Sequence, residues 1–546
     1  MRKLVVFLCV FLFCSIFRAF SIAIGFPLNY TAGGVWPKPV KYISNSTYMV
    51  LRPDSFNFKV ERYDCDIIQE AIRRYYRLIF DADINQQTFT STDGYNNSSR
   101  TDGTSSIVYL DTLHIHLMTS CKMFPSDSMD EKYELLLKTD GSESNSSLIA
   151  QSVWGVLRGL ETFSQIVVPI NGNRFAVRTT SIVDFPRFPH RGLLIDTSRH
   201  YLPVKTIMNI LEAMSYSKLN VLHWHIVDDQ SFPFQSNTFP DLSDKGSYDR
   251  YRAIYSQVDV RRVIEHARLR GIRVIPEFDS PGHTLSWGKG IPGLLTQCNH
   301  SYPQPYGPID PTNENNYVIL RRLFKEIHEV FPDKYLHLGG DEVDFGCWKS
   351  NENISKYMEI NNISSYEQLD AYYIDRLLNI TNEIKAKAIV WEEVFDNNVP
   401  LRKDTIIQVW RYANHPELYY KKLFNVTDDG YPALLSGCWY LDSLANGGDW
   451  EKFYKCDPLA FNGTEEQKRL VLGGEACMWG EVVDETNVQQ RIWPRACAAA
   501  EVLWSGNGST FADAAERIEE HVCRLKKRGI PAQPPNGPAF CPYTVM

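Results

Sequence analysis

Eight apolar, strand-like runs follow one another after residue 189, and nearly every run ends on polar or aromatic residues. The runs are residues 191–199, 220–229, 273–281, 335–342, 388–394, 405–411, 433–440 and 470–481. Helical spacing of apolar residues lies between several of them, at 204–215, 258–269, 317–331 and 366–384. Strand and helix alternating eight times predict an α/β fold, a parallel (β/α)8 TIM barrel whose strands are apolar because both faces are buried. We expect residues 511–527 to form its closing helix.

Residues 24–185 predict a smaller α/β domain ahead of a barrel domain at 186–546. Residues 65–80 and 150–163 have helical spacing, and residues 113–117 and 133–137 are strand-like. We expect a hinge at 180–189, because it contains Pro186 and Pro189 and proline cannot continue a helix or a central strand.

Residues 1–23 are typical of a secretory signal peptide, with Arg2 and Lys3 ahead of an apolar core and a small-residue region. No other stretch approaches the length of apolar sequence that spans a bilayer. We therefore expect a lysosomal or secreted protein with no transmembrane segment. Twelve Asn-X-Ser/Thr sequons agree and predict a glycoprotein with glycans mostly on exposed loops. They start at Asn29, Asn45, Asn96, Asn97, Asn145, Asn299, Asn353, Asn362, Asn379, Asn425, Asn462 and Asn507.

Composition excludes one class of partner and favours disulfides. The net charge is −8 and no basic block or basic helix occurs, so we expect no nucleic-acid partner. Of the 12 cysteines, Cys9 and Cys14 fall inside the signal segment. The others would meet an oxidising compartment, and no C-x-x-C spacing suggests a zinc cluster. Cys477, inside an apolar run, is the candidate for a free buried thiol.

Chemistry in such barrels sits at the C-terminal ends of the strands, so the strand ends predict one site. They carry Arg199, Asp228, Asp229, Asp279, His283, Asp341, Glu342, Trp391, Glu392, Glu393, Trp410, Trp439, Tyr440, Asp442, Trp479 and Glu481. Asp341 and Glu342 would point to opposite faces of a regular strand. Gly339 and Gly340 relax that constraint, and the pair then indicates an acid/base site. For an isolated Asp-Glu, a capped turn with solvated acids is the alternative.

Tryptophans at four strand ends favour a carbohydrate pocket, because aromatic faces pack against sugar rings. Core packing is the alternative for each tryptophan taken alone. His223 and His225 have the spacing of a metal pair. We instead expect them to orient carboxylates by hydrogen bonds, and we expect no metal and no cofactor.

Four motifs together resemble glycoside hydrolase family 20, and within it the lysosomal β-N-acetylhexosaminidase type. They are Arg191-Gly-Leu-Leu-Ile-Asp-Thr-Ser-Arg199-His-Tyr, His223-Trp-His225-Ile-Val-Asp228-Asp, His337-Leu-Gly-Gly-Asp341-Glu342 and Glu475-Ala-Cys-Met-Trp479-Gly-Glu481. They occur in the family's order, and the similarity covers essentially the whole mature chain.

The resemblance implies a retaining exo-enzyme that removes terminal β-linked N-acetylglucosamine or N-acetylgalactosamine from glycoconjugates, with the substrate's acetamido oxygen as nucleophile. Glu342 would be the acid/base, and Asp341 would orient the acetamido group and stabilise the oxazolinium-like intermediate. Tyr440 would hydrogen-bond the acetamido oxygen, within walls made by Trp391, Trp410 and Trp479. Arg199 and Glu481 would bind ring hydroxyls, and Asp228 and His283 would form a supporting pair.

The resemblance also implies disulfides Cys65–Cys121, Cys298–Cys347 and Cys523–Cys541. Cys438 and Cys456 have no partner in that pattern, and we expect an extra bridge between them. A homodimer or a heterodimer with a related subunit is implied as well. Asp442-Ser443 stand where the subunit type that accepts acidic substrates carries Asn-Arg, so neutral substrates are expected. Two alternatives remain: a secreted enzyme acting on chitin oligosaccharides, and a non-catalytic sugar-binding barrel.

Overall fold

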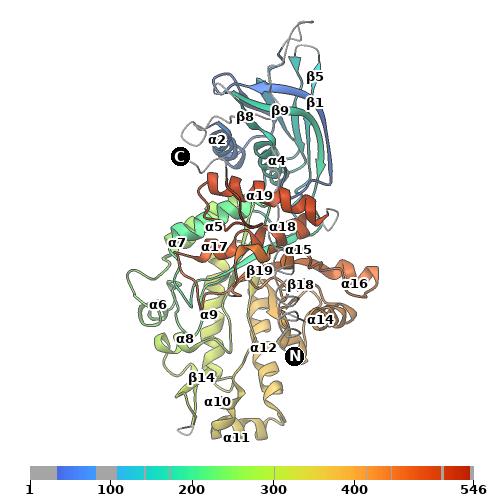
Figure 1. Ribbon diagram of the computed structural model, residues 1–546. Helices are drawn as coiled ribbons and strands as arrows, with labels where there is room; N and C mark the ends of the chain where they lie inside the picture. Colours follow the sequence, from blue (N-terminus) through green and yellow to red (C-terminus); the bar gives the residue numbers. More distant parts are fainter. Residues whose placement is uncertain are drawn as a thin grey trace, which may run out of the picture.

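The computed structural model describes residues 34–80, 107–140, 143–170, 174–299, 302–413, 415–443, 445–505 and 510–541. Within these residues the chain forms an open N-terminal sheet and a closed eight-stranded barrel, one above the other in Figure 1. The fold is therefore the (β/α)8 TIM barrel with a smaller α/β unit ahead of it, as the hydrophobic pattern predicts. The expected signal segment at 1–23 lies outside the described residues.

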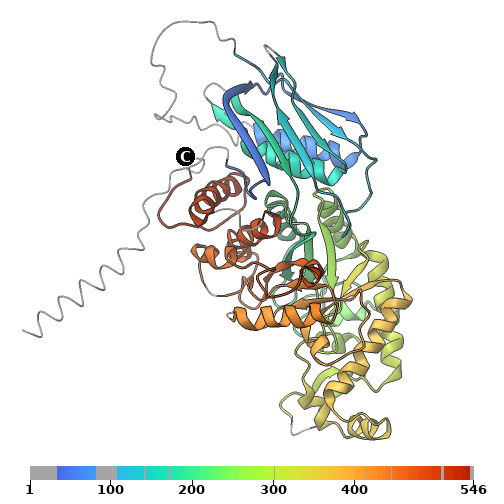
Figure 2. The same ribbon diagram turned by 90° about the vertical axis from the view of Figure 1, so that its right-hand side faces the viewer.

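The N-terminal sheet has the order β1-β9-β4-β7-β3-β2, with β8 paired to β9. Its strands are β1 Lys41–Leu51, β2 Asn57–Arg62, β3 Thr112–Leu117, β4 Tyr133–Leu137, β7 Ser147–Ala150, β8 Val168–Ile170 and β9 Arg174–Asp184. Strands β5 Thr139–Asp140 and β6 Glu143–Ser144 form a separate short hairpin. Helices α2 Asp66–Phe80 and α4 Val153–Ile166 pack on one face of the sheet (Figure 2). Every residue of α4 is buried, since the helix is covered by the sheet and by the barrel.

The barrel closes in the order β10-β11-β12-β15-β16-β17-β18-β19. Its strands are β10 His190–Asp196, β11 Val221–His225, β12 Arg273–Glu277, β15 Tyr335–His337, β16 Lys387–Trp391, β17 Ile406–Val409, β18 Ala433–Leu435 and β19 Val471–Met478. All neighbours are parallel, and the strands are almost entirely buried, which explains their continuous apolar runs. A short antiparallel pair, β13 Leu295–Gln297 and β14 Tyr306–Ile309, lies in the connection that leads from β12 to the helix before β15.

Helices surround the barrel, and the longer ones follow the predicted periodicity. They are α5 Val204–Tyr216, α6 Asp241–Gly246, α7 Gln257–Arg268, α8 Leu285–Gly290, α9 Glu314–Val330, α10 Phe345–Ser350, α11 Glu352–Ile360, α12 Tyr366–Glu383, α13 Glu392–Asp396, α14 Pro416–Asp428, the short η1 Gly447–Asp449, α15 Trp450–Tyr454, α16 Glu465–Leu470, α17 Val488–Ile492, α18 Arg495–Trp504 and α19 Phe511–Lys527.

Two expectations about the frame were wrong. Helix α19 has the predicted bounds, but it is α18 that packs on β10 and β19 and closes the barrel, because its alanine-rich surface allows close approach. Helix α19 instead lies against the N-terminal unit, where Arg524 donates to Gln165 of α4. The hinge is also shorter than expected, since β9 continues to Asp184 and pairs with β1 and β4 through residues 180–184. The domain division at residue 185 stays a prediction.

Buried ion pairs join the N-terminal unit to the barrel. Glu131 lies 2.6 Å from Arg191 of β10, and Asp184 lies 2.7 Å from Lys218 after α5. All four side chains are essentially inaccessible to solvent. Arg158 of α4 pairs with Glu131 at 2.8 Å and donates to backbone carbonyls of the barrel at residues 270 and 271. The two parts therefore meet through paired charges as well as through apolar contacts.

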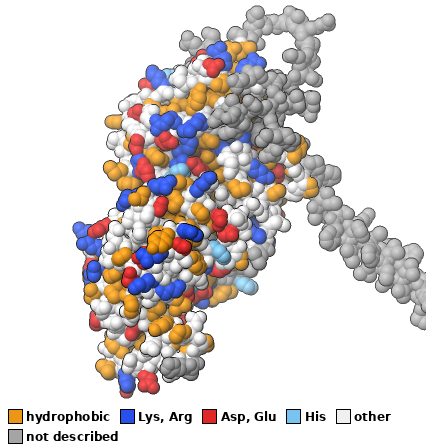
Figure 3. All heavy atoms as spheres, turned by 90° about the vertical axis from the view of Figure 1, so that its left-hand side faces the viewer, with side chains coloured by type: hydrophobic (Ala, Val, Ile, Leu, Met, Phe, Trp, Pro, Cys, Tyr) orange, Lys and Arg blue, Asp and Glu red, His pale blue; other side chains and the backbone are white. Residues whose placement is uncertain are grey.

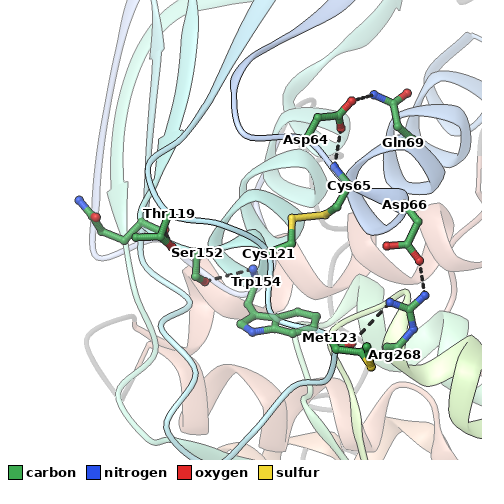
Figure 4. The surroundings of a disulfide bond; sticks show 11 residues. Asp64, Cys65, Asp66, Gln69, Thr119, Cys121, Met123, Ser152, Trp154 and Arg268 are labelled. Atoms are coloured by element: carbon green, nitrogen blue, oxygen red, sulfur yellow. Dashed lines mark hydrogen bonds and ion pairs between the residues drawn. A yellow bond between two sulfur atoms is a disulfide. The ribbon is translucent and has the colours of Figure 1, made fainter.

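The described residues contain four disulfides: Cys65–Cys121, Cys298–Cys347, Cys438–Cys456 and Cys523–Cys541. They include the three implied by the resemblance and the expected extra bridge. Cys477 and Cys497 are free and buried. Figure 4 shows the first disulfide at the start of α2, where Arg268 of α7 donates to the Asp66 carboxylate and to the backbone oxygen of Met123.

The described surface agrees with a glycoprotein of mixed charge. Eight of the predicted sequons fall on described residues, and the asparagine is exposed in each: Asn45, Asn145, Asn299, Asn353, Asn362, Asn379, Asn425 and Asn462. The expectation that most lie on loops is not met among these eight, because four lie in helices or strands: Asn45 in β1, Asn353 in α11, Asn379 in α12 and Asn425 in α14. Asn29, Asn96, Asn97 and Asn507 lie outside the described residues. Basic and acidic side chains are interspersed on the face shown in Figure 3. Among the described residues, no helix combines the length and apolar character needed to cross a membrane.

Candidate active site

A left-handed turn after β15 brings two adjacent carboxylates to the mouth of the barrel. Gly339 and Gly340 have φ of 68° and 93°, and Glu342 has φ of 49°. A Cβ atom on Gly339 would lie only 1.7 Å from Oδ1 of Asp279, so the first position must be glycine. The Gly340 amide donates to that same oxygen at 2.9 Å. This turn ends the predicted strand early, at His337, and frees Asp341 and Glu342 from strand alternation.

The two carboxylates have different surroundings. Asp341 is buried, and its Oδ1 has no hydrogen-bond partner in the structure. The Glu342 side chain keeps 58% of its surface exposed. One oxygen of each lies 3.7 Å from Nε2 of His283. A buried acceptor beside an accessible carboxyl group allows the two residues to take different roles.

Asp228 and His283 form the expected pair beside these carboxylates. Asp228 Oδ1 lies 3.2 Å from His283 Nδ1, and its Oδ2 lies 2.9 Å from the Arg199 guanidinium. Burial opposes a charge on His283, but Asp228, Asp279 and Asp341 outweigh it and hold the imidazole pKa well above its usual value. Burial likewise opposes the charge on Asp228, but His225 and His283 hold its pKa below the usual range. The pair is therefore an imidazolium on a carboxylate.

Asp279 is a buried acid that the strand-end pattern picked out without a role. Burial, reinforced by the charge of Asp341, raises its pKa well above the usual carboxyl value. Its Oδ1 accepts from the catalytic turn and its Oδ2 has no partner. Asp279 thus supports the turn that carries Asp341.

An aromatic pocket lies next to Asp341. Ring centroids are 6.3 Å apart for Trp391 and Trp410, 6.0 Å for Trp391 and Trp479, 6.0 Å for Trp410 and Tyr440, and 6.4 Å for Tyr440 and Trp479. Cys477 and Leu194 are fully buried in contact with these rings. Burial and the nearby Cys477 raise the pKa of Tyr440 well above its usual value, so its hydroxyl is a donor. The fourth strand-end tryptophan, Trp439, packs in the core and donates to the Phe453 carbonyl.

Arg199, Glu481 and Asp442 lie on one side of this pocket. The Arg199 guanidinium is 5.2 Å from the Trp479 ring and 3.8 Å from an oxygen of Glu481, which is 54% exposed. Burial, with the charge of Glu481 adding to it, raises the pKa of Asp442. Asp442 Oδ1 is buried with no partner. The residues that the resemblance implies for catalysis and substrate binding therefore occur at one end of the barrel, whereas Trp439 of the strand-end set packs in the core.

The histidine pair at 223 and 225 lies beneath the pocket in a hydrogen-bonded network. His223 Nδ1 lies 2.7 Å from Glu475, and His225 Nε2 lies 2.7 Å from Asp228. Both histidines also reach Glu277, at 2.9 and 2.7 Å. His223, Glu277 and His337 are close enough to hold a metal ion, but each is already engaged with the others. The geometry favours carboxylate orientation over metal binding.

Sequence reasoning missed Glu277, and it gave no role to Glu393, which it placed at a strand end, or to Glu475, which it named only within a motif. Glu277 and Glu475 each interrupt an apolar barrel strand, and a charge inside a barrel must be paired, so that interruption was the available signal. Glu393 accepts from the Trp410 indole at 2.8 Å, and burial with the nearby Asp341 raises its pKa to about 8. It lies on α13, and its position relative to Asp341 could not be read from spacing.

Paired carboxyl groups and clustered aromatic side chains at the C-terminal ends of (β/α)8 strands are typical of one class of protein, the glycoside hydrolases. The model of glycosyl hydrolase family 20, catalytic domain, matches residues 188–507, and a model described as beta-acetyl hexosaminidase like matches residues 35–166. The chain belongs to glycosyl hydrolase family 20.

Relatives agree over most of their length. The chain is 50% identical to beta-hexosaminidase subunit beta of Mus musculus, over 86% of this chain and 85% of the relative. It is 46% identical to beta-hexosaminidase subunit alpha of Rattus norvegicus, over 94% and 96%. Among solved structures, a chitobiase from Flavobacterium johnsoniae superposes with a TM-score of 0.77 at 28% identity, covering 91% of this chain and 73% of that one.

Proposed function

We propose that this chain is a retaining exo-β-N-acetylhexosaminidase that removes terminal non-reducing N-acetylglucosamine or N-acetylgalactosamine from β-linked glycoconjugates. The observation that carries the proposal is the contrast between Asp341 and Glu342. One turn presents a buried carboxylate with an unpaired oxygen and an accessible carboxyl group, beside an aromatic pocket. The relatives named beta-hexosaminidase support the same activity.

In the first step the accessible Glu342 protonates the leaving glycosidic oxygen. The substrate's own acetamido oxygen attacks the anomeric carbon from within the pocket and forms an oxazolinium-like ring. Asp341 accepts the acetamido N–H through its unpaired Oδ1 and stabilises the positive charge that develops there. Tyr440 donates its hydroxyl to the acetamido oxygen.

In the second step Glu342 takes a proton from water, and the water opens the oxazolinium-like ring with overall retention. The Trp391, Trp410 and Trp479 rings hold the acetamido group against rotation and keep bulk water away from it. Arg199 and Glu481 bind ring hydroxyls at the open side of the pocket. His283, held by Asp228, presents its Nε2 to both carboxylates.

The remaining strand-end carboxyl groups support assistance by the substrate over a protein nucleophile. Asp228 is occupied by Arg199, His225 and His283, and Asp279 by the Gly340 amide. Glu393 holds the Trp410 indole. Several strand-end carboxyl groups keep a buried oxygen without a partner, namely Asp279, Asp341, Glu392, Glu393 and Asp442. Of these, Asp341 belongs to the same turn as Glu342, and it is adjacent to the acid rather than opposite to it.

The test combines a variant with an inhibitor. Glu342→Gln is expected to lower turnover at least ~10²-fold on β-N-acetylglucosaminides with poor leaving groups, while the fold is kept. A stable thiazoline analogue of N-acetylglucosamine is expected to inhibit competitively and more tightly than substrate, because it mimics the cyclised intermediate. Full activity of Glu342→Gln would remove that residue from the mechanism. A covalent glycosyl ester trapped on a carboxylate by a 2-fluoro sugar would overturn substrate assistance.

A second class of natural substrate for this enzyme is supported by one similar protein of known structure. The chitobiase likeness supports chitin oligosaccharides as the natural substrate, with the same catalytic residues. Rates on chitobiose and on neutral N-glycan fragments, measured with one preparation, separate the two. The half-buried Asp442 carboxylate favours neutral over anionic sugars in either case.

Assembly and location extend the same proposal. The relatives are named as alpha and beta subunits, which supports a homodimer or a heterodimer with a related chain. Exposed sequons and four disulfides support passage through the secretory pathway to the lysosome or the cell exterior. Light scattering of the secreted protein and glycosidase digestion test these two points.

A further inference from the structure

A single buried carboxylate in the centre of the barrel is shared by three histidines and one tryptophan. Glu277, on β12, is completely buried. Its Oε2 lies 2.9 Å from His223 and 2.7 Å from His225. Its Oε1 lies 3.1 Å from His337 and accepts from the Trp391 indole at 2.8 Å. None of the chemical steps above uses this residue.

The two oxygens of Glu277 serve different sides of the pocket. Oε1 fixes the ring of Trp391, a wall of the proposed acetamido pocket. Oε2 accepts from Nδ1 of His225, and Nε2 of the same imidazole lies 2.7 Å from Asp228. Asp228 in turn holds His283 at 3.2 Å. The Glu277 carboxylate therefore connects the proposed acetamido pocket, through Trp391, to the Asp228–His283 pair beside Glu342.

The charges along this path alternate. Burial opposes the positive charge of His225, but Glu277 and Asp228 outweigh it and raise the pKa of His225 to about 10. Burial opposes the negative charge of Glu277 too, and the facing imidazoles of His337, His225 and His223 hold its pKa well below the usual value. The charge of Glu277 also contributes to the raised pKa of the nearby Asp279. The neutral indole of Trp391 completes its surroundings.

We infer that Glu277 is a positioning residue for the hydrolysis: it sets the Trp391 wall and the His225–Asp228–His283 arm at a fixed relative position. This inference rests on the proposed function. Because proximity in the reacting complex decides the rate, a displacement of about 1 Å at either branch is sufficient for a 10²-fold loss.

Glu475 provides a matched control. It is also completely buried in the barrel interior, and its carboxylate is shared by His190 at 2.6 Å, His223 at 2.7 Å and Gln408 at 2.9 Å. Its side chain has no hydrogen bond or ion pair with a residue of the described pocket. Loss of either carboxylate removes an anion that faces buried histidines and destabilises the protein, whereas of the two only Glu277 contacts the pocket and its arm.

The experiment measures kcat, KM and thermal midpoint from pH 4 to 9 on an aryl β-N-acetylglucosaminide, for wild type, Glu277→Gln, Glu277→Asp and Glu475→Gln. Glu277→Gln is expected to lower kcat about 10- to 100-fold with little change in KM. Its alkaline limb moves to lower pH, because His225 without the facing anion loses its proton at a lower pH. Glu475→Gln loses thermal stability but keeps kcat within about twofold and an unshifted limb.

Glu277→Asp keeps the charge but is one methylene shorter, so it cannot reach Trp391 and His225 together. It is expected to keep the wild-type alkaline limb and still lose about tenfold in kcat. Wild-type kcat in Glu277→Asp, or equal kcat losses in Glu277→Gln and Glu475→Gln, would overturn the inference while wild type stays active. A wild type that hydrolyses no β-N-acetylglucosaminide would overturn the proposed function, and the inference with it.

Discussion

The turn that presents Asp341 and Glu342 depends on one absent side chain, that of Gly339. Alanine there meets two separate penalties. A φ of 68° costs roughly 1–2 kcal/mol for a residue with a Cβ atom. The Cβ atom would also lie 1.7 Å from Asp279 Oδ1, so Asp279 must move and lose its hydrogen bond to the Gly340 amide, worth about 0.5–1.5 kcal/mol. Gly339→Ala is therefore expected to lose about 1.5–3.5 kcal/mol of stability.

Activity is expected to suffer more than stability. The displaced Asp279 shifts the turn, and a shift of about 1 Å in Asp341 and Glu342 lowers kcat about 10²-fold. Gly430→Ala is the matched control, because Gly430 has a φ of 77° and no atom within 4 Å of the added Cβ. That variant carries the strain of the backbone alone and keeps wild-type kcat. Thermal denaturation and kcat on an aryl β-N-acetylglucosaminide give both readings. If Gly339→Ala keeps the kcat of Gly430→Ala, the contact with Asp279 does not hold the turn.

Three other predictions follow from charge and cross-linking. Burial raises the pKa of Asp370 to about 7, so between about pH 4 and 7 the folded state keeps a proton that the unfolded chain has lost, and the contribution of Asp370 to stability falls as pH rises. The thermal midpoint of Asp370→Asn, relative to wild type, should therefore be higher at pH 7.5 than at pH 5. An equal difference in thermal midpoint at the two pH values refutes this prediction. Loss of the disulfide Cys438–Cys456, whose cysteines are 18 residues apart, should lower the free energy of unfolding by about 3 kcal/mol. It should also raise KM, because the loop that this disulfide closes carries Tyr440 and Asp442. Loss of Cys523–Cys541, also separated by 18 residues, should leave KM unchanged. A carboxylate at Asp442 facing a 6-sulfate costs about 4 kcal/mol before screening, and a third of that energy corresponds to roughly a tenfold change in rate. Asp442→Asn with Ser443→Arg should reduce the preference for neutral over 6-sulfated substrate. If the ratio of kcat/KM for the two substrates is the same in the variant and the wild type, Asp442 does not face C6 of the sugar.

The barrel and the place of its site could be predicted because parallel strands leave long apolar runs and end in polar residues. The pattern found all eight strands, although β15 stops at His337 because the left-handed glycines leave the ladder there. It misassigned the closing helix, since α18 and α19 both have apolar faces and only packing decides which one meets β10.

Residues that act through other residues were the harder part of the site. Glu277 and Glu475 look like isolated acids in apolar strands, and their histidine partners lie on other strands of the barrel. The register between β11, β12 and β19 brings them together, and one sequence without its pairing does not give that register. Glu393 was placed at a strand end but given no role for the same reason, because its partner Trp410 is on the following strand end.

The ion pairs between the N-terminal unit and the barrel have a consequence for how the protein unfolds. If the N-terminal unit opened alone, Arg191 and Lys218 would remain on the barrel without Glu131 and Asp184. Removing one partner of a buried ion pair costs about 3–5 kcal/mol, because the other partner is left as an uncompensated buried charge. Two such pairs make a half-open state too scarce to accumulate, so the N-terminal unit and the barrel melt together. The fold thus behaves as one cooperative unit, and calorimetry should record a single transition in which a nick or a destabilising substitution in the N-terminal sheet lowers the thermal midpoint of the catalytic barrel too.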